Sequence, residues 1–189
     1  MISFSDIKVC FIDIDGTLTN GIYQISENGV VTKSFYTRDF YAIERIMKAG
    51  IKVVILTQSH DGVIYKQIER ICNHSDYWRD CYEENGQLTI FTGIKNKEYV
   101  VEICLQAEEL KWDNVAYIGD AENDVGCMKK SLYIGCPKDA IDDVISEVED
   151  KKLEEVEGEG WRSTFNGGKG AVHEICLKIL REKSENFKT

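Results

Sequence analysis

The sequence predicts an α/β fold in which helices cover both faces of a central parallel sheet. Short apolar runs alternate with helix-like stretches along the whole chain. Strands and helices that alternate at this spacing form parallel sheets with helical crossovers. The chain has 189 residues, of which 43% are hydrophobic, enough for one domain with a substantial core. We therefore expect a single domain spanning residues 1–189.

Each expected element follows from its local pattern. The expected strands are Ile7–Ile14, Ile51–Leu56, Leu88–Phe91, Val115–Ile118 and Leu132–Ile134. The expected helices are Arg38–Ala49, Asp61–Cys72, Asn96–Leu110, Glu122–Lys130, Lys138–Glu147 and a C-terminal helix with apolar residues at helical spacing from Ala171. Asn28-Gly29, between Ile22–Ile25 and Val30–Phe35, predicts a β-hairpin.

Composition excludes several classes of function. The net charge of −10 argues against a nucleic-acid partner, which needs a basic surface. No apolar run approaches the roughly 18 residues of a membrane helix, so we expect no membrane partner. The seven cysteines are odd in number and form no Cys-x-x-Cys pair. They indicate reduced thiols and a cytoplasmic protein.

Two stretches look like additions to a minimal core. Residues 73–87 are polar and aromatic, and residues 147–159 carry seven acids, which predicts a solvated helix or loop for the second. Near the first stretch, Cys72, His74 and Cys81 could hold a metal ion, but their spacing matches no common zinc pattern.

The most informative motif is the acid pair that closes the first strand. Asp13 and Asp15 stand two residues apart, so an extended backbone directs both side chains to one face. Gly16 then allows a close turn. Two carboxylates held together repel unless a cation or a shared proton relieves them. The pair therefore indicates chemistry at this point.

Polar residues close two further strands at the same edge of the sheet. Thr57 follows the strand Ile51–Leu56, and Asp120 follows Val115–Ile118. Ligands of such sheets bind beyond the carboxyl ends of the strands. A strand-end hydroxyl or acid is common by itself, but three strands delivering polar groups to one edge predict a site.

These residues could together hydrolyse a phosphate monoester. Asp13 would attack phosphorus, and Asp15 would protonate the leaving oxygen and then activate water. Thr57 would donate its hydroxyl to the phosphoryl group, and Lys97 would supply positive charge. An oxygen-only set from Asp13, Asp15 and Asp120, including a backbone carbonyl, suits Mg²⁺.

Other residues have weaker assignments. Asn123 and Asp124 lie on the next helical turn and could orient the metal ligands. Lys97 taken alone is as consistent with a surface lysine, and Asp124 with a helix-start acid. The histidines His60, His74 and His173 are typical of surface or tail positions.

The motifs resemble those of the haloacid dehalogenase superfamily. The run Asp13-Ile-Asp-Gly-Thr-Leu-Thr19 is similar to its first motif, Thr57 to the second, Lys97 to the third, and Gly119-Asp-Ala-Glu-Asn-Asp124 to the fourth. The resemblance implies a Rossmann-like three-layer sandwich, Mg²⁺ as cofactor and an aspartyl-phosphate intermediate. It also implies that Gly16, Thr57 and Lys97 contact the substrate.

A narrower resemblance involves the capless 3-deoxy-D-manno-octulosonate 8-phosphate phosphatases and their nonulosonate 9-phosphate relatives. It rests on the hairpin in place of a cap domain, on Phe35-Tyr-Thr-Arg-Asp39 and on Gly167-Gly-Lys-Gly-Ala-Val-His-Glu174. It implies a homotetramer that acts on a sugar phosphate. The hairpin flap, residues 20–36, would cover a neighbour's site, and the glycine-rich tail and helix, residues 166–183, would help close it.

The chain departs from this pattern around the leaving group. Gln58-Ser59 replaces Gly-Arg, Phe40 replaces a small residue, and His173 replaces an arginine. Gln58 and His173 are therefore candidate substrate-binding residues, and the sugar stays open between the eight- and nine-carbon acids.

Two other functions compete with the phosphatase. A related non-catalytic domain ends the CMP-sialic acid synthetases, so an oligomerisation domain is the main alternative. A phosphotransferase or mutase would need a cap that excludes water, and the short segment between the first two motifs has no room for one.

Overall fold

A six-stranded sheet forms the centre of the structure, a computed structural model that describes residues 6–153 and 158–185. In spatial order its strands are β5 (Leu88–Phe91), β4 (Lys52–Leu56), β1 (Val9–Ile12), β6 (Val115–Ile118), β7 (Tyr133–Cys136) and β8 (Glu159–Arg162). All neighbouring strands are parallel. Since β1 lies between β4 and β6, the topology places a crevice beyond its carboxyl end.

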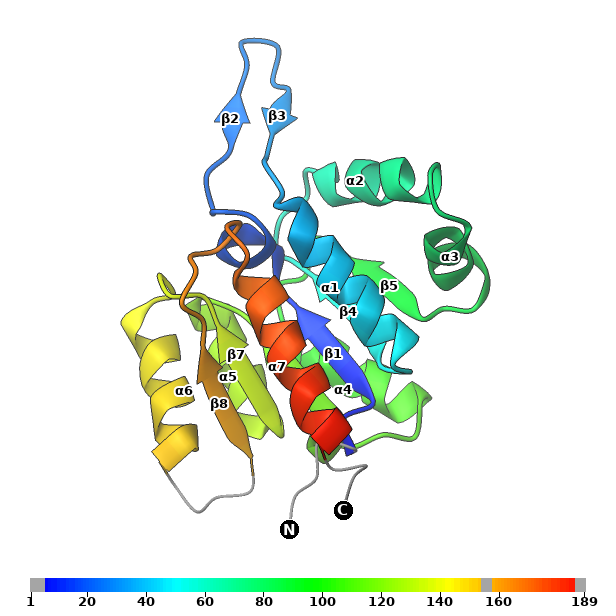
Figure 1. Cartoon of the computed structure of the whole chain (residues 1–189). Coiled ribbons are helices and arrows are strands. Elements are labelled where there is room, and N and C mark those ends of the chain that lie inside the picture. Colours follow the sequence, from blue (N-terminus) through cyan, green and yellow to red (C-terminus); the bar gives the residue numbers. More distant parts are fainter. Residues whose placement is uncertain (1–5, 154–157, 186–189) are drawn as a thin grey trace.

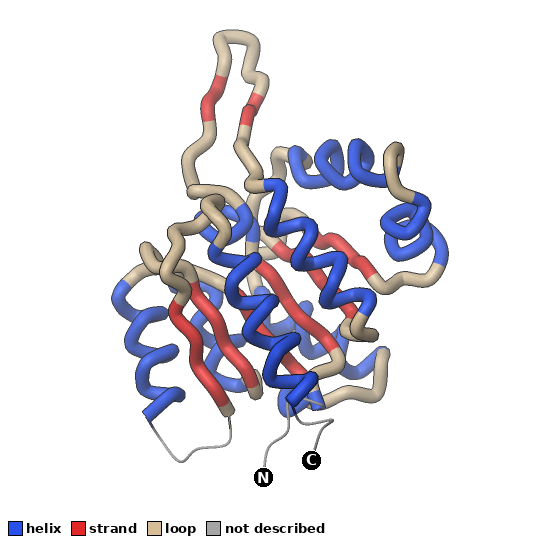
Figure 2. The backbone as a smooth tube through the Cα atoms, in the orientation of Figure 1, coloured by secondary structure: helices blue, strands red, loops and turns tan. Residues whose placement is uncertain are grey.

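Helices cover both faces of this sheet (Figures 1 and 2). One face carries α1 (Thr37–Lys48), α2 (Val63–Cys72), α3 (Asp76–Arg79) and α7 (Ala171–Glu185). The other carries α4 (Lys97–Ala107), α5 (Glu122–Lys130) and α6 (Asp142–Leu153). Short helical turns occupy Asp80–Glu84 and Trp112–Asn114. The predicted α/β three-layer sandwich is confirmed.

Strand β1 shows how the sequence pattern builds the two cores. Cys10 and Ile12 belong to the hydrophobic cluster beneath α1 and α7, whereas Val9 and Phe11 belong to the cluster beneath α4 and α5. All four are buried, as expected for a central strand covered on both faces.

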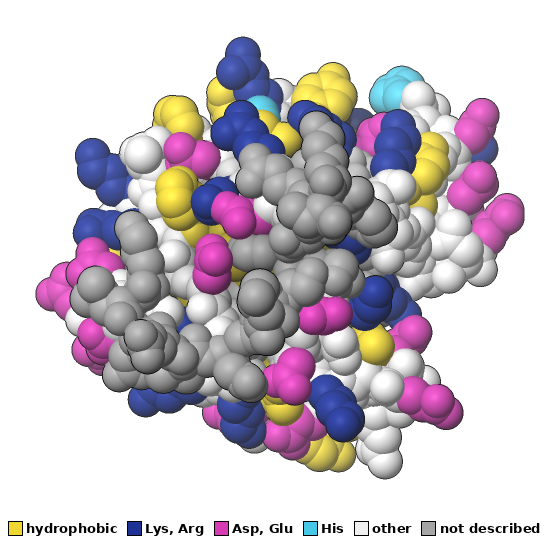
Figure 3. Space-filling view, turned by 60° about the horizontal axis from the view of Figure 1, so that its bottom comes forward, with side chains coloured by type: hydrophobic (Ala, Val, Ile, Leu, Met, Phe, Trp, Pro, Cys, Tyr) yellow, Lys and Arg dark blue, Asp and Glu magenta, His cyan; other side chains and the backbone are white. Residues whose placement is uncertain are grey.

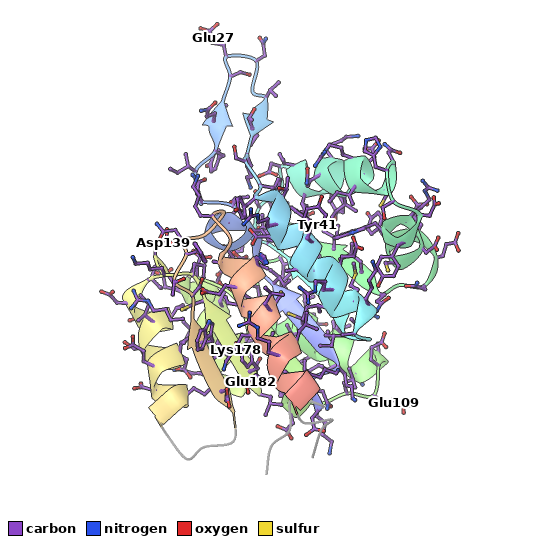
Figure 4. All side chains as sticks on the ribbon, in the orientation of Figure 1. Glu27, Tyr41, Glu109, Asp139, Lys178 and Glu182 are labelled. Carbon is purple, nitrogen blue, oxygen red and sulfur yellow. The ribbon has the colours of Figure 1, made fainter. Side chains whose placement is uncertain are left out.

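The predicted hairpin projects from the carboxyl edge of the sheet, with Glu27 at its tip (Figure 4). Its strands are β2 (Gln24–Ile25) and β3 (Val31–Thr32), which form two residue pairs. Gly29 adopts φ +76° at the turn, a conformation that glycine adopts readily. The segment between β1 and α1 thus contains a hairpin and no cap domain.

The structure differs from the expected elements in three places. The first strand ends at Ile12 because Ile14–Leu18 form a helical turn directly after the extended residue Asp13. Strand β8 was not predicted, since Glu159-Gly-Trp-Arg162 has only one apolar residue. The helix expected at Lys138–Glu147 is instead Asp142–Leu153, so it continues into the acidic stretch, of which residues 154–157 lie outside the described residues.

The stretch 73–87 contributes to the core. Trp78, in α3, is 2% exposed, and its indole N–H donates to Glu44 Oε2 at 2.8 Å. Because an aromatic side chain buries a large apolar area, Trp78 fixes this insertion against α1.

No helix in the described residues is both long and apolar enough to cross a membrane. Figure 3 shows the molecule turned so that the end bearing the termini comes forward; there, acidic and basic side chains are intermixed.

Candidate active site

Four elements bring polar side chains together at the carboxyl edge of the sheet. Asp13 follows β1, Thr57 follows β4, Asp120 follows β6, and Lys97 is the first residue of α4. Asn96 begins that helix by accepting the Tyr99 N–H at 3.1 Å, the geometry of a capping residue. The helix start therefore directs Lys97 inward.

Lys97 links two carboxylates in the interior. Its Nζ lies 2.5 Å from Asp13 Oδ1 and 2.7 Å from Asp124 Oδ1, and its side chain is completely buried. Burial lowers the pKa of Lys97, but the two carboxylates outweigh this effect, so that the pKa is raised. A permanent positive charge is thus fixed beside Asp13 without contact with solvent.

Asp124 holds this arrangement in place. Its Oδ1 also accepts the Tyr117 hydroxyl at 2.7 Å, and its Oδ2 accepts the backbone N–H groups of Asp120 and Ala121 at 3.1 and 3.2 Å. A Cβ at Gly119 would lie 2.4 Å from the Asp124 carboxyl carbon. The glycine of the fourth motif is therefore needed for Asp124 to reach back over the strand end.

The carboxylates around Asp13 repel one another when they are ionised. Burial, followed by the neighbouring Asp124, raises the pKa of Asp13 well above its ordinary value, although Lys97 opposes this. Burial raises the pKa of Asp120 to about 6, against a hydrogen bond from Thr17. Such shifts at a clustered site are typical of functional carboxylates.

These acids fit a divalent cation. Oxygen atoms of Asp13, Asp120 and Asp124 lie within 4.8 Å of one another, which is the only such grouping in the described part of the chain. Asn123 is adjacent to Asp124 in the sequence. Its Oδ1 atom is buried and has no hydrogen-bond partner among the described residues. An all-oxygen set with an orphaned acceptor suits Mg²⁺. Cys72, His74 and Cys81 form no such group.

The carboxylate of Asp15 has different partners. Its Oδ2 accepts the Thr57 hydroxyl at 3.0 Å, and its Oδ1 accepts Lys33 Nζ at 2.6 Å. The Asp15 side chain is therefore not part of the cluster of three carboxylates, whose third member is Asp124. The metal contribution expected from Asp15 stays a prediction, and its backbone carbonyl is the remaining candidate.

Gly16 lies between the acidic cluster and the residues that contact Asp15. It adopts φ +98°, and a Cβ there would lie 2.0 Å from Asp120 Oδ2. Any larger residue would displace Asp120, which is held by the Thr17 hydroxyl at 2.8 Å. The glycine of the first motif thus allows the loop to pass directly against the acid.

Known proteins resemble this chain in sequence, although no protein-family model matches it. The 3-deoxy-D-manno-octulosonate 8-phosphate phosphatase KdsC of Salmonella typhi is 27% identical over 180 residues, which are 95% of this chain and 82% of that protein. The KdsC of Haemophilus influenzae is 26% identical over 188 residues, 96% of this chain and 87% of the relative. The resemblance to KdsC-like proteins of the haloacid dehalogenase superfamily is confirmed.

Solved structures agree on the fold. The 3-deoxy-D-manno-octulosonate 8-phosphate phosphatase of Moraxella catarrhalis, in complex with a magnesium ion, a phosphate ion and KDO, superposes with a TM-score of 0.78 at 20% identity. The match covers 96% of this chain and 90% of that one. The cobalt-bound form of the Haemophilus influenzae enzyme gives 0.73 at 24% identity, covering 96% and 91%.

The glycine-rich tail packs against the first motif. The Gly168 N–H donates to the Thr17 carbonyl at 3.0 Å, and the Gly167 N–H to Asp139 Oδ1 at 2.9 Å. A Cβ at Gly167 would lie 1.7 Å from the Gly16 carbonyl oxygen. These glycines are explained by close backbone approach, since a side chain would separate the tail from the loop.

Two predicted substrate residues lie outside these contacts. Gln58 is exposed, and His173 lines a cavity of about 220 Å³ with Arg38 and Lys169. The His173 backbone N–H donates to Asp39 Oδ1 at 2.8 Å. Burial, followed by Arg38, lowers the pKa of the His173 imidazole. Contact of either residue with substrate stays a prediction.

Lys33 and Tyr117 were missed from the sequence. Lys33 lies on a polar hairpin, and its partner Asp15 is 18 residues away in sequence. Tyr117 lies within an apolar strand, where the sequence pattern indicates a core residue. The one available signal for Lys33 is that it is the only lysine of the hairpin, residues 20–36.

Proposed function

We propose that this chain is a Mg²⁺-dependent phosphomonoesterase that hydrolyses a phosphorylated 3-deoxy-2-keto sugar acid through an aspartyl phosphate. The observation that carries the proposal is Asp13, held between the Lys97 ammonium and the Asp120 carboxylate at the end of the central strand. The substrate class is supported by the KdsC relatives, which match 95% of the chain.

In the first step Asp13 attacks phosphorus and the bond from phosphorus to the sugar oxygen breaks. Asp15 gives its proton to that leaving oxygen. In the second step the Asp15 carboxylate takes a proton from water as the water attacks phosphorus, which releases phosphate and restores Asp13. Lys97 donates a hydrogen bond to a phosphoryl oxygen. The Thr57 hydroxyl, which donates to Asp15 Oδ2 in the structure, would donate to the phosphoryl group instead once substrate binds, which leaves Lys33 as the donor to Asp15. Mg²⁺ held by Asp13 and Asp120 would polarise the phosphoryl group and offset the nearby charges.

The competing role of a non-catalytic oligomerisation domain accounts for fewer observations. It needs neither the buried Lys97 between two acids nor a Gly16 that accommodates Asp120. A purely structural domain would be more stable with apolar groups in place of these charges, since burying ion pairs is costly.

For assembly we infer a homotetramer in which the hairpin covers a neighbouring site. The supporting observation is a set of hydrophobic residues that project from the hairpin and are 56–68% exposed: Ile22, Tyr23, Ile25 and Val30. Apolar groups gathered on a projecting element are typical of an interface.

We also infer a cytoplasmic protein without nucleic-acid or membrane partners, supported by seven free cysteines.

The proposal is tested by phosphate release from a panel of octulosonate 8-phosphate, nonulosonate 9-phosphates and hexose phosphates. We expect Mg²⁺-dependent turnover that is fastest on one of the acidic sugars. No turnover above background on any of them, with or without Mg²⁺, would contradict the proposal. Turnover of hexose phosphates alone would retain the chemistry and overturn the substrate class.

A further inference from the structure

The side chain of Lys33 is buried, although most of the hairpin that carries it is exposed. Its side chain is 3% exposed, and Tyr23 on the opposite strand lies over it, with 5.8 Å from Nζ to the ring centroid. Its Nζ lies 2.6 Å from Asp15 Oδ1, 2.5 Å from Asp61 Oδ2 and 3.2 Å from Ser59 Oγ. The hairpin therefore inserts one charge into the edge of the site.

All three N–H groups of this ammonium have a partner. A lysine has three donors, and Asp15, Asp61 and Ser59 accept one each. Lys33 is consequently not available to bind a phosphoryl or carboxylate oxygen while these contacts exist. Its effect on the reaction must pass through the residues that it holds.

The residue that it holds on the reaction side is Asp15. Lys33 contacts Oδ1, and Thr57 donates to Oδ2 at 3.0 Å, so that each carboxylate oxygen has its own donor. Two donors at opposite oxygens fix the rotation of the carboxyl plane. A proton donor must meet the leaving oxygen in one orientation, because proton transfer requires hydrogen-bond geometry.

Asp61 fixes the other end of the contact. Its Oδ1 accepts the Val63 N–H at 2.9 Å at the start of α2, and its Oδ2 accepts the Ser59 hydroxyl at 2.5 Å. Asp61 is thus fixed within the loop that leads into α2, whereas Lys33 belongs to a hairpin with only two residue pairs. This ion pair therefore ties the base of the hairpin to the edge of the site.

We propose that Lys33 is a positioning residue that orients the Asp15 carboxyl for proton transfer and makes this orientation depend on the seating of the hairpin. The inference rests on the proposed phosphatase function and deepens it. It predicts that Lys33 matters for substrates whose leaving oxygen needs a proton. It matters little for substrates whose leaving group departs as a stable anion.

The experiment compares kcat/KM for an alkyl phosphate and for p-nitrophenyl phosphate in the full chain with Mg²⁺. The variants are Lys33→Met, which keeps the length of the side chain, Lys33→Arg and Asp61→Asn. Lys66→Met is the matched control, because Lys66 is an 81% exposed lysine on α2. We expect Lys33→Met to lower kcat/KM about 30-fold for the alkyl phosphate and less than about threefold for p-nitrophenyl phosphate.

Lys33→Arg should restore part of the loss, and Asp61→Asn should show a weaker form of the same preference. Equal losses on both substrates would overturn the inference, because a merely structural defect affects both alike. An increase in KM for acidic sugar phosphates alone would also overturn it, by showing direct substrate binding. If the unaltered protein hydrolyses neither substrate nor any sugar phosphate, the proposed function fails as well.

Discussion

Two lysines each bridge a pair of acids in this site, and they come from different parts of the molecule. Lys97 starts a core helix and joins Asp13 to Asp124, whereas Lys33 comes from the projecting hairpin and joins Asp15 to Asp61. Both lysines have a raised pKa, because their carboxylate partners outweigh the effect of burial. The contacts are similar, but the elements that support them are not.

This difference assigns the two halves of the reaction to different structures. In the proposed mechanism the nucleophile, Asp13, is fixed by packed elements, and Lys97, with two described partners for three donors, would have one N–H for a phosphoryl oxygen. The proton donor is held by a segment that joins the fold through few contacts. The position of the nucleophile is therefore preorganised by the core, whereas the orientation of the proton donor depends on the contact that the hairpin makes.

The largest effect is expected from Asp13→Asn. Removal of the nucleophile should lower kcat by at least about 10⁴-fold, because Asp124, the other acid that Lys97 contacts, is 0% exposed and is held by the Tyr117 hydroxyl and two backbone N–H groups. Phosphate release and analytical ultracentrifugation are the measurements, with exposed Asp113→Asn as control. Loss of activity with unchanged oligomeric state is the expected outcome, and retained activity would remove Asp13 from the mechanism.

Lys97→Met and Lys33→Met contrast the two sides directly. Lys97→Met should reduce the free energy of unfolding by about 3–5 kcal/mol, since it leaves Asp13 and Asp124 buried and unpaired. Lys33→Met should cost about 1 kcal/mol or less, because Asp15 is 31% exposed. Urea unfolding of each variant gives both values, and equal losses would show that the hairpin lysine belongs to the core.

Asp39 is a buried carboxylate that contacts no lysine among the described residues. Burial raises its pKa from 3.8 to about 7, and its Oδ2 has no hydrogen-bond partner among the described residues. The folded protein therefore keeps the proton that the unfolded chain releases above pH 3.8. Stability from this group is complete at low pH and is lost as the pH rises to about 7.

Asp39→Asn removes this dependence while keeping an acceptor for the His173 N–H. The difference in unfolding free energy between the variant and the unaltered protein should grow in favour of the variant by roughly 1–4 kcal/mol from pH 4 to pH 7. Urea unfolding across this range measures it. A constant difference would show that Asp39 titrates normally in the folded state.

The smallest effect is expected from Tyr117→Phe. It removes the hydroxyl that donates to Asp124 Oδ1 at 2.7 Å and should cost about 1–2 kcal/mol of stability. Activity should fall only a few-fold, because Lys97 and two backbone N–H groups still hold Asp124. A loss of activity as large as that of Lys97→Met would show that the hydroxyl takes part in the chemistry.

The sequence revealed the half of the site that the sheet positions. Asp13, Thr57 and Asp120 follow strands whose apolar runs are plain in the sequence, and parallel strands bring such ends to one edge. Lys97 was found through its place in the motif order, because a lysine at a helix start has no local sign of burial. Five of the six strands described in the sheet, all except β8, were predicted for the same reason.

The half of the site held by the hairpin was not visible in the sequence. The contact of Lys33 with Asp15 depends on how the base of the hairpin packs against the edge of the site, which no local pattern specifies. Strand β8 was missed because Gly160 and two charged residues weaken its strand pattern, although pairing with β7 places it in the sheet. Longer-range packing determines both features.

The central claim is that Asp13 becomes phosphorylated during turnover. The most direct measurement is an acid quench during steady-state hydrolysis with Mg²⁺, followed by borohydride reduction, digestion and mass spectrometry. We predict homoserine at position 13, formed from the acyl phosphate, and none in the Asp13→Asn variant. Homoserine at another carboxylate, or none at any position while phosphate is released, would contradict the account.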